Sequence, residues 1–355
     1  MAAREWLAIL EESAFNTPVI TGSQVIGTNV FYARLDGSDS FTMRPVPEMV
    51  SVPYGGGVAI DAFRVSDKTT LAGRLTTKLY QGAYASFLLS WAGVRINSGQ
   101  TAPWTTTEPP GDLASCAILH AIQATTVSGT TSYVLRGYTG VKVAGYDFSI
   151  SEQSQVGTLS LDLMGSTPLP AVEGGSAAAW FPSAPTDVQL PGPQGTGGGL
   201  GPYVFTHAGT GGGGTSLVLG GGGTPITRAQ FQSIHISSKN ALMKRHWANQ
   251  FAQTLRFCGR STTLEAQHFY NITPDDRINY ETVTAMTPAT FQLYASSTEA
   301  ITWNFNSNSV LTSVTDQLAL SDLFLQTLTL TSQYDSTVGS GYAQDYSLTL
   351  LPSTF

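Results

Sequence analysis

The chain has 355 residues, of which 41% are hydrophobic and only 12% are charged, and its formal net charge is −7. The length predicts two domains, and the hydrophobic fraction excludes a wholly disordered chain. A protein that reads nucleic acid normally carries a basic patch, whereas the one dense basic cluster here, Lys244 to His246, is interpreted as a solvated turn or a subunit contact. Because uncharged polar residues are poor at preventing association, the low charge predicts a surface that other subunits largely cover.

The acidic excess lies in the last quarter of the chain. Acidic and basic residues balance up to Ile272, whereas Thr273 to Phe355 contains eight acidic residues and a single basic one, Arg277. Cys116 and Cys258 are too few for a disulfide framework in a chain of this size, so both are expected to be buried and reduced. The sequence shows no signal peptide and no run near the ~18 apolar residues of a membrane span, which predicts a soluble protein made in a cytoplasm.

In chain order, the first half reads mainly as strands with one clear helix. A weak helical pattern covers 4–13, and apolar residues at helical spacing cover 79–93. Alternation of period two dominates 157–165, where three leucines share one face and Ser160 and Asp162 share the other.

The second half continues this pattern. A helix is predicted over 273–286, because Thr273 can cap it and Pro274 suits the first helical position. Alternating apolar residues over 300–306 predict a strand. We therefore expect a mainly β fold with few helices, a β-rich α+β protein. Other segments rich in β-branched and aromatic residues, which favour strands, are 114–127, 141–151, 231–238 and 323–332.

Residues 64–91 and 256–283 form a candidate internal repeat. Each segment runs as a strand, then Thr-Thr-Leu, then a second short strand that closes on an apolar residue and a tyrosine, and then a predicted helix. The pattern predicts a duplicated strand–strand–helix–strand–strand unit, with chance similarity in a Thr-rich sequence as the alternative. The repeated positions are Arg64, Thr70, Leu71 and Tyr80 in the first copy and Arg256, Thr263, Leu264 and Tyr270 in the second.

A glycine-rich stretch from Gly192 to Pro225 separates the two copies. Its single G-x-G-x-x-G match, which begins at Gly209, is followed by a strand pattern rather than a helix, so a dinucleotide site is not expected. The apolar segments Pro202–Phe205 and Ser216–Leu219 are predicted to order as short strands or an arm, against the second domain or a neighbouring ring, with mobile glycine hinges beside them. The candidate arm residues are Pro202, Tyr203, Phe205, Leu217 and Leu219.

No catalytic or metal-binding constellation is recognisable in the sequence. The five histidines include no pair at the i, i+4 spacing of a helical zinc site, and Asp36–Ser40 lacks the Gly and Glu that complete a calcium loop. A nucleophile elbow is absent. We therefore expect no enzyme activity, no cofactor and no metal.

The order of four segments resembles the tail tube proteins of long-tailed, non-contractile (siphovirus-type) bacteriophages, with two tube domains in one chain. These segments are Gly73–Gly93, Tyr133–Ser151, Gln155–Pro168 and Phe231–Leu242. The helix start departs from the family pattern, because Tyr80 is followed by Gln81 and not by proline. The resemblance implies that each tube domain is a β-sandwich or barrel with a flanking helix.

The resemblance also implies a structural role in the virion tail. Subunits would join their sheets into rings that stack into a tube, with a trimer of pseudo-sixfold symmetry favoured over a hexamer and other tail proteins at the tube ends. Double-stranded DNA would pass through the lumen without sequence-specific binding, and the tail would assemble in the bacterial host cytoplasm. The alternatives are a tail terminator or distal-tail ring protein of the same fold lineage, or a β-rich extracellular binding or adhesin module.

The repeat and the resemblance together divide the chain into four parts. They are an N-terminal segment (1–14), tube domain 1 (15–168), a Pro/Gly-rich connection or arm (169–225) and tube domain 2 (226–355). An acidic lumen would repel DNA phosphates and let DNA slide. The candidate lumen acids, drawn from the acidic last quarter, are Asp316, Asp322 and Asp335.

Overall fold

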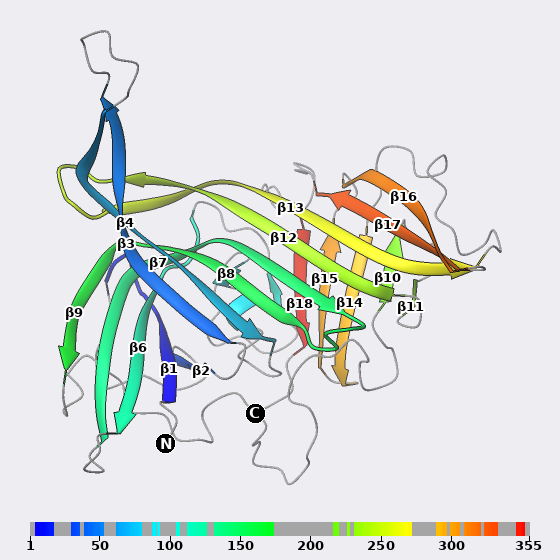
Figure 1. The fold of residues 1–355 in the computed structure, drawn as a ribbon, viewed down its shortest axis with the longest axis horizontal. Helices are drawn as coiled ribbons and strands as arrows, with labels where there is room; N and C mark the ends of the chain where they lie inside the picture. Colours follow the sequence, from blue (N-terminus) through cyan, green and yellow to red (C-terminus); the bar gives the residue numbers. More distant parts are fainter. Residues whose placement is uncertain are drawn as a thin grey trace.

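Almost all of the described chain forms antiparallel β strands (Figure 1), which confirms the expected mainly β fold class. The fold is known from a computed structural model. The residues that it describes are 4–17, 30–35, 39–52, 62–79, 87–89, 91–92, 104–106, 112–125, 131–173, 216–219, 226–227, 231–271, 289–296, 299–305, 309–320, 323–332 and 346–351.

The main sheet has twelve strands and branches at the long strand β7. The first part of β7 pairs with β6 and β9, and its second part pairs with β8 and β12. One branch continues from β12 through β13 and β17 to β16, a second from β8 through β4 to β3, and a third from β6 through β1 to β2. The strands are β1 (Arg4–Glu11), β2 (Val30–Arg34), β3 (Ser40–Val52), β4 (Ala62–Lys78), β6 (Cys116–Thr125), β7 (Thr131–Ser151), β8 (Thr158–Gly165), β9 (Thr167–Glu173), β12 (Phe231–Arg245), β13 (Thr254–Asn271), β16 (Val310–Leu320) and β17 (Leu323–Thr331).

A second sheet of six strands packs against the main sheet. Its order is β11-β10-β14-β15-β18-β5. The contact is aromatic: the ring of Trp303 stacks on the rings of Phe148 in β7 and Phe291, with centroids 5.1 Å and 5.3 Å away. The strands are β5 (Trp104–Thr106), β10 (Ser216–Leu219), β11 (Ile226–Thr227), β14 (Ala289–Ser296), β15 (Glu299–Phe305) and β18 (Tyr346–Leu351).

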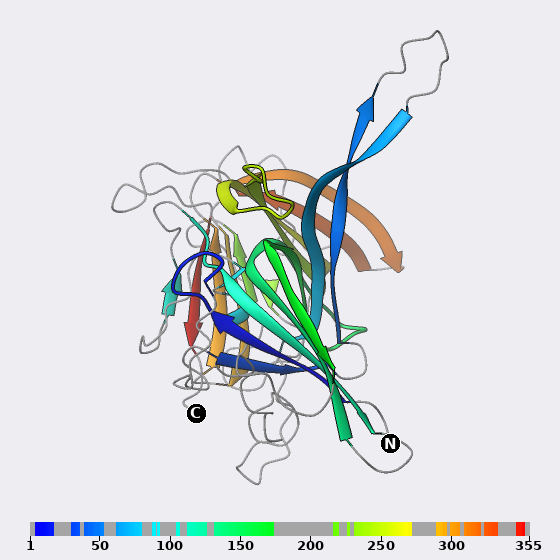
Figure 2. The same ribbon diagram turned by 90° about the vertical axis from the view of Figure 1, so that its left-hand side faces the viewer.

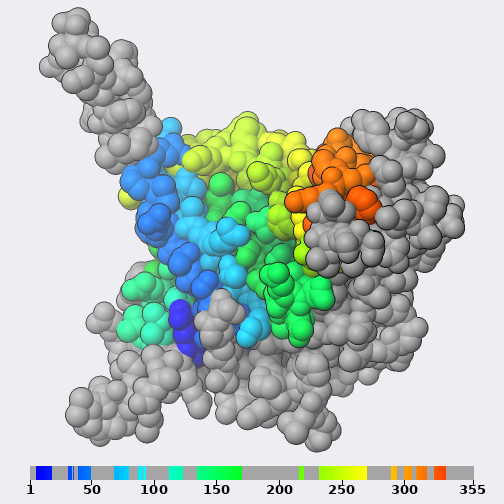
Figure 3. Space-filling model, turned by 45° about the vertical axis from the view of Figure 1, so that its right-hand side comes forward, coloured from blue at the N-terminus to red at the C-terminus, as the bar shows by residue number. Residues whose placement is uncertain are grey.

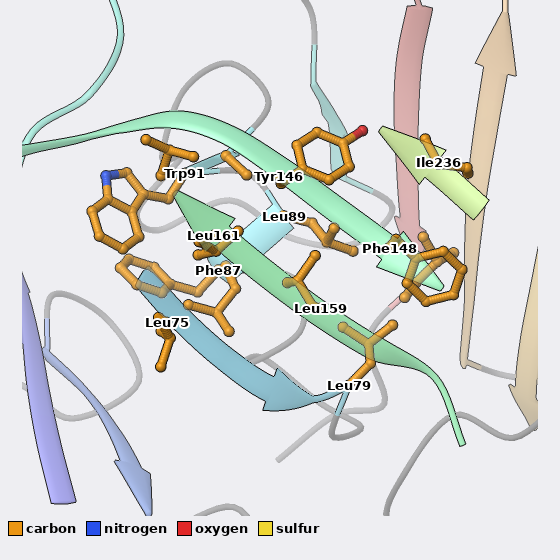
Figure 4. Close-up of a cluster of buried hydrophobic side chains, with 14 of the residues drawn as sticks. Leu75, Leu79, Phe87, Leu89, Trp91, Tyr146, Phe148, Leu159, Leu161 and Ile236 are labelled. Atoms are coloured by element: carbon orange, nitrogen blue, oxygen red, sulfur yellow. The ribbon is translucent and has the colours of Figure 1, made fainter. Parts of the chain in front are cut away.

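The core follows the period-two alternation read from the sequence. In β8, Leu159 and Leu161 are buried among Leu75, Phe87 and other apolar side chains (Figure 4), whereas Asp162 between the leucines of this strand is exposed. Because every second residue of a strand points to the same face, the leucine face of β8 is apolar and buried and its opposite face is polar.

The helix expected over 4–13 is wrong, because residues 4–11 form strand β1. This strand lies between β6 and β2, and both of its faces are buried: Leu7 and Ile9 belong to one hydrophobic cluster, and Trp6 and Leu10 to another. A short apolar run that is buried on both sides has no alternation, so its periodicity does not distinguish a strand from a helix.

Part of the helix expected over 79–93 is present, since residues 87–89 and 91–92 are helical. The helix expected over 273–286 lies outside the described residues. Each Thr-Thr-Leu segment was expected to separate two strands, and this is wrong: it lies inside one continuous strand, β4 in the first half and β13 in the second. Threonine is β-branched and favours the extended chain, so it prolongs the strand.

The two cysteines differ in exposure. Cys116 is buried and Cys258 is exposed, both as free thiols, so the expectation of two buried thiols is wrong for Cys258. The pairing of β12 with β13 skips Cys258, because Ala241 pairs with Gly259 and Leu242 with Phe257. The residue left over at a bulge belongs to neither ladder position, and here its side chain faces outward.

Candidate assembly surfaces

Strands from the two halves of the chain meet in one continuous ladder, here called the seam. The seam joins β7 to β12 in an antiparallel register that runs from Ser151↔Ser233 to Gly145↔Lys239. On its buried side, Phe148 lies opposite Ile236 and Ile150 opposite Ile234, and all four side chains are buried. The seam therefore combines backbone pairing with a strip of hydrophobic core.

The run of strands through the seam ends in two outer edges. Its order is β16-β17-β13-β12-β7-β8-β4-β3. Within the described residues, β3 pairs with β4 alone and β16 with β17 alone. Figures 1 and 3 place the β3–β4 strands (blue) and the β16–β17 strands (orange) on opposite sides of the molecule. Edge strands carry unpaired N–H and C=O groups that can pair with another chain.

The two sides of the seam have the same pairing order. In the first half, the hairpin β3–β4 joins the hairpin β7–β8 through β4 and β8; in the second half, the hairpin β12–β13 joins the hairpin β16–β17 through β13 and β17. By position in this pairing order, β16 of the second half corresponds to β7 of the first half. In the same order, β3 of the first half corresponds to β12 of the second half. Duplication of the chain itself stays a prediction.

The polar face of the main sheet carries a charge network that crosses the seam. Asp147 of β7 contacts Arg74 of β4 at 3.3 Å and His235 of β12 at 3.5 Å, and Arg74 also lies 3.8 Å from Asp162. These side chains are substantially exposed, so each pair contributes little to stability. No sequence motif marks this network, although the alternation around Ser160 places Asp162 on the polar face.

The turn of the β12–β13 hairpin docks on the β3–β4 hairpin. The ammonium of Lys244 lies 2.6 Å from a carboxylate oxygen of Glu48 and 3.1 Å from the hydroxyl of Thr70, and the N–H of Thr69 donates to the carbonyl of Gln250 at 2.7 Å. The basic cluster from Lys244 is thus a contact with the other half of its own chain. The same turn exposes Trp247. Figure 2 shows the β3–β4 hairpin continuing past the body of the molecule.

The repeated positions lie in matching strands. Thr70 and Leu71 are buried in β4, and Leu264 is buried in β13 beside the partly exposed Thr263. Arg64 lies in β4, where it pairs with Val50. In β13, Arg256 is exposed and Tyr270 pairs with Phe324 of β17. Tyr80 lies outside the described residues. The described positions are spread along the two strands, and of these Thr70 contacts Lys244 of the other hairpin.

Of the three candidate lumen acids, only Asp316 lies in a described segment. It is an exposed residue of β16, and its carboxylate accepts a hydrogen bond of 2.8 Å from the side-chain amide of Gln326. Asp322 and Asp335 lie outside the described residues. The acidic lining therefore stays a prediction, with Asp316 placed on an edge strand.

One of the two predicted arm segments is a strand of the second sheet. Ser216–Leu219 forms β10, which pairs with β14 and β11 of the same chain, and Leu217 is fully buried. This confirms the expected short strand against the second half, with Leu219 packed at the margin of the core. Pro202, Tyr203 and Phe205 lie outside the described residues, and an inter-subunit role of the arm stays a prediction.

The described residues contain no group of three or more His, Cys, Asp or Glu side chains arranged to hold a metal ion. No helix in this part of the chain has the length and apolar character needed to cross a membrane. The sequence matches no protein-family model and no curated protein.

Proposed function

We propose that this chain is a structural protein of a siphovirus-type phage tail, in which three copies close into a ring and the rings stack into a DNA-conducting tube. The seam carries this proposal. Each chain already contains one β7–β12 ladder, and it presents β16 and β3, the strands in the equivalent places, at its two outer edges.

Pairing of β16 with β3 of the next chain would repeat the seam between chains. A head-to-tail interface of this kind either closes into a ring or continues as an open filament, depending on its rotation. Closure removes both edges of the run from β16 to β3, which otherwise invite uncontrolled pairing. In the single chain, β3 is an edge strand, where proline is tolerated, and it carries Pro45 and Pro47. In a closed ring neither proline could donate an N–H to the interchain ladder. Each proline keeps a carbonyl oxygen that an incoming strand can use as acceptor.

The shared Thr-Thr-Leu segments give the register of the interchain seam on the β3 side. When Leu71 is aligned with Leu264, Val46 corresponds to Ser237, because Val46 pairs with Thr70 and Ser237 pairs with Thr263. In the seam, Ser237 lies opposite Asp147. Val46 of one chain should therefore lie opposite the counterpart of Asp147 in the next.

That counterpart is Gln317 of β16. Asp147 pairs with Ser160 of β8, and Ser160 pairs with Thr76 of β4. In the same way, Gln317 pairs with Leu325 of β17, and Leu325 pairs with Phe269 of β13. Phe269 is the residue that aligns with Thr76 when Leu264 is aligned with Leu71. Val46 and Gln317 are both exposed in the single chain, and Val46 is one of few large apolar side chains exposed in its described part.

In the proposed ring, the polar face of the main sheet lines the lumen. This face presents hydroxyl side chains and charges of both signs, with Asp147 and Asp162 close to Arg74. Binding to DNA strengthens with the number of cationic groups that contact phosphates. Because Arg74 is paired with these carboxylates, it offers DNA fewer phosphate contacts, which favours passage over retention.

A cysteine pair at Val46 and Gln317 tests the proposal. Residues directly opposite in an antiparallel ladder have Cβ atoms about 4.5–5.5 Å apart, close to disulfide geometry. With Cys258→Ser as background, Val46→Cys with Gln317→Cys should form interchain disulfides in concentrated protein, ending in a three-chain species on non-reducing gels. Electron microscopy of the same sample should show rings or tubes with a central hole.

The control keeps Val46→Cys and moves the second cysteine to the exposed Thr312, which lies in the same strand but out of register. Equal cross-linking of both pairs, or monomers without cross-links at high concentration, contradicts the proposed ring. Rings that cross-link in register and never stack would instead favour a terminator or distal-ring role.

A further inference from the structure

The side chain of Lys142 lies in the interior beside a carboxylate. This side chain, from β7, is 2% exposed, and its ammonium lies 2.6 Å from Oδ2 of Asp112. It also donates a hydrogen bond of 2.6 Å to the carbonyl of Leu255 and lies 5.1 Å from the centre of the Phe15 ring. Three different segments of the chain thus fix the nitrogen against one carboxyl group.

The other oxygen of Asp112 is held by two backbone donors. Oδ1 accepts the N–H of Leu113 at 2.9 Å and the N–H of Phe257 at 3.0 Å. Two N–H groups aimed at one carbonyl oxygen form the arrangement that stabilises the oxyanion of a tetrahedral intermediate. Oδ2 is left facing the amine, and because the Asp112 side chain is 47% exposed, a water molecule released there can leave to solvent.

A second carboxyl group, that of Glu12, adjoins this pair. Its two oxygens accept the N–H of Gly140 at 2.8 Å and that of Asn16 at 3.0 Å, and Gly140 is only two residues from Lys142. Burial raises the pKa of Glu12 and lowers the pKa of Lys142. Both shifts reduce the cost of moving a proton from the ammonium to the Glu12 carboxylate, which would leave Lys142 as a neutral nucleophile.

We propose that Lys142 and Asp112 condense into an intramolecular isopeptide bond. The lysine nitrogen attacks Cγ of Asp112, the intermediate places its negative charge on Oδ1, and the Cγ–Oδ2 bond then breaks. Two protons of the ammonium leave with Oδ2 as one water molecule, and the third stays on the amide nitrogen. One positive and one negative charge disappear together, so the net charge is unchanged, and no oxidant or other reactant is needed.

The bond would close the open end of the β6–β7 hairpin. Cys116 of β6 pairs with Val141 of β7, and the side chains of Asp112 and Lys142 meet just beyond this pair. Through its hydrogen bonds with the backbone of Leu255 and Phe257, the pair also contacts β13. The inference is independent of the proposed tube function, because it needs only the folded single chain.

Intact mass spectrometry of the denatured protein tests the bond directly. The wild-type mass should be lower by one water molecule than the mass that its sequence gives, and a protease digest should contain one branched peptide joining the segments around residues 112 and 142. Lys142→Arg keeps the positive charge without a primary amine, and its mass should equal that of its sequence.

Two further variants report on the chemistry. Asp112→Asn should lose one molecule of ammonia in place of water, and Glu12→Gln should slow the mass change measured over time after refolding. The wild-type measurement does not depend on whether any variant folds. A folded wild-type protein that keeps its full mass after prolonged incubation, as Lys142→Arg does, would overturn the proposal and leave the pair as an ion pair.

Discussion

At the residue scale, the contact between the two sheets is aromatic. Trp303 is fully buried between Phe148 of the main sheet and Phe291 of its own sheet, and the centroids of the three rings lie within 6.4 Å of one another. Large aromatic side chains dominate core energetics, since each buries much apolar area and gains further from ring geometry. This cluster therefore determines how firmly the second sheet is attached.

Trp303→Ala should lower the free energy of unfolding by about 3–5 kcal/mol, because it removes buried area and leaves a cavity. Chemical denaturation followed by circular dichroism measures the change. Trp247→Ala is the matched control, since its side chain is 66% exposed, and its effect should stay within about 0.5 kcal/mol. Similar losses for the two variants would contradict the assigned packing.

His120 makes the stability of the β1–β6 pair depend on pH. Burial lowers the pKa of His120 below 6.5, although its hydrogen bond to Glu5 acts in the opposite direction. The unfolded chain therefore binds the proton more readily than the folded chain does. The stabilisation is complete above pH 6.5 and is lost as the pH falls toward the lowered value.

The free energy of unfolding of the wild type should thus fall between pH 7 and pH 5 more steeply than that of His120→Gln, which has no proton to gain. Urea denaturation at several pH values provides the comparison. Parallel pH profiles of the two proteins would show that His120 keeps its ordinary pKa in the fold.

At the element scale, the close antiparallel pairing of β3 with β4 depends on a glycine. A Cβ added at Gly73 would run into the carbonyl oxygen of Thr42 and approach the Cα of Met43 to 2.9 Å. Both are backbone atoms, which cannot move aside as the end of a flexible side chain can. The two strands approach this closely where Met43 pairs with Gly73.

Gly73→Ala should therefore destabilise the chain by about 1–3 kcal/mol, the range found for overpacked cores. Thermal unfolding measures the loss. Thr76→Ala, three residues further along β4 and on its polar face, provides the comparison and should change the stability little. Equal melting temperatures of the wild type and Gly73→Ala would show that β3 and β4 lie further apart.

The positions of the strands in this fold were more predictable from the sequence than the pairing between them. Alternation in β8 and β15 predicted both the strands and their buried faces, because one face of each meets the core. The strand β1 was missed because both of its faces are buried. The seam could not be predicted, since the pairing of β7 with β12 depends on contacts between residues about ninety positions apart, which no local pattern encodes.

At the scale of the whole molecule, electrostatics would separate assembly from DNA transport in the proposed tube. The candidate lumen acids are expected to repel DNA without holding the ring together. Asp316 shares its strand face with Val314, which packs against the core, so it lies on the face opposite to Gln317 and to the proposed lumen lining. Long-range repulsion of this kind weakens as ionic strength rises.

Neutralising Asp322 and Asp335 to Asn together should leave tube assembly intact and slow or stall DNA release, whereas Asp316→Asn alone should change neither. Electron microscopy of the tubes and a DNA-ejection assay on assembled particles measure the two effects separately. Unchanged ejection would show that these residues do not line the path, while loss of tubes would assign them to an interface.

The seam inside each chain also changes how assembly depends on concentration. In the proposed ring, every second sheet junction forms as the chain folds, as an intramolecular event that dilution cannot reverse. Only the remaining junctions require encounters between chains. Ring formation would then follow the third power of the protein concentration, where separate single-domain subunits would follow the sixth, so a ring could form from far scarcer protein at the start of synthesis.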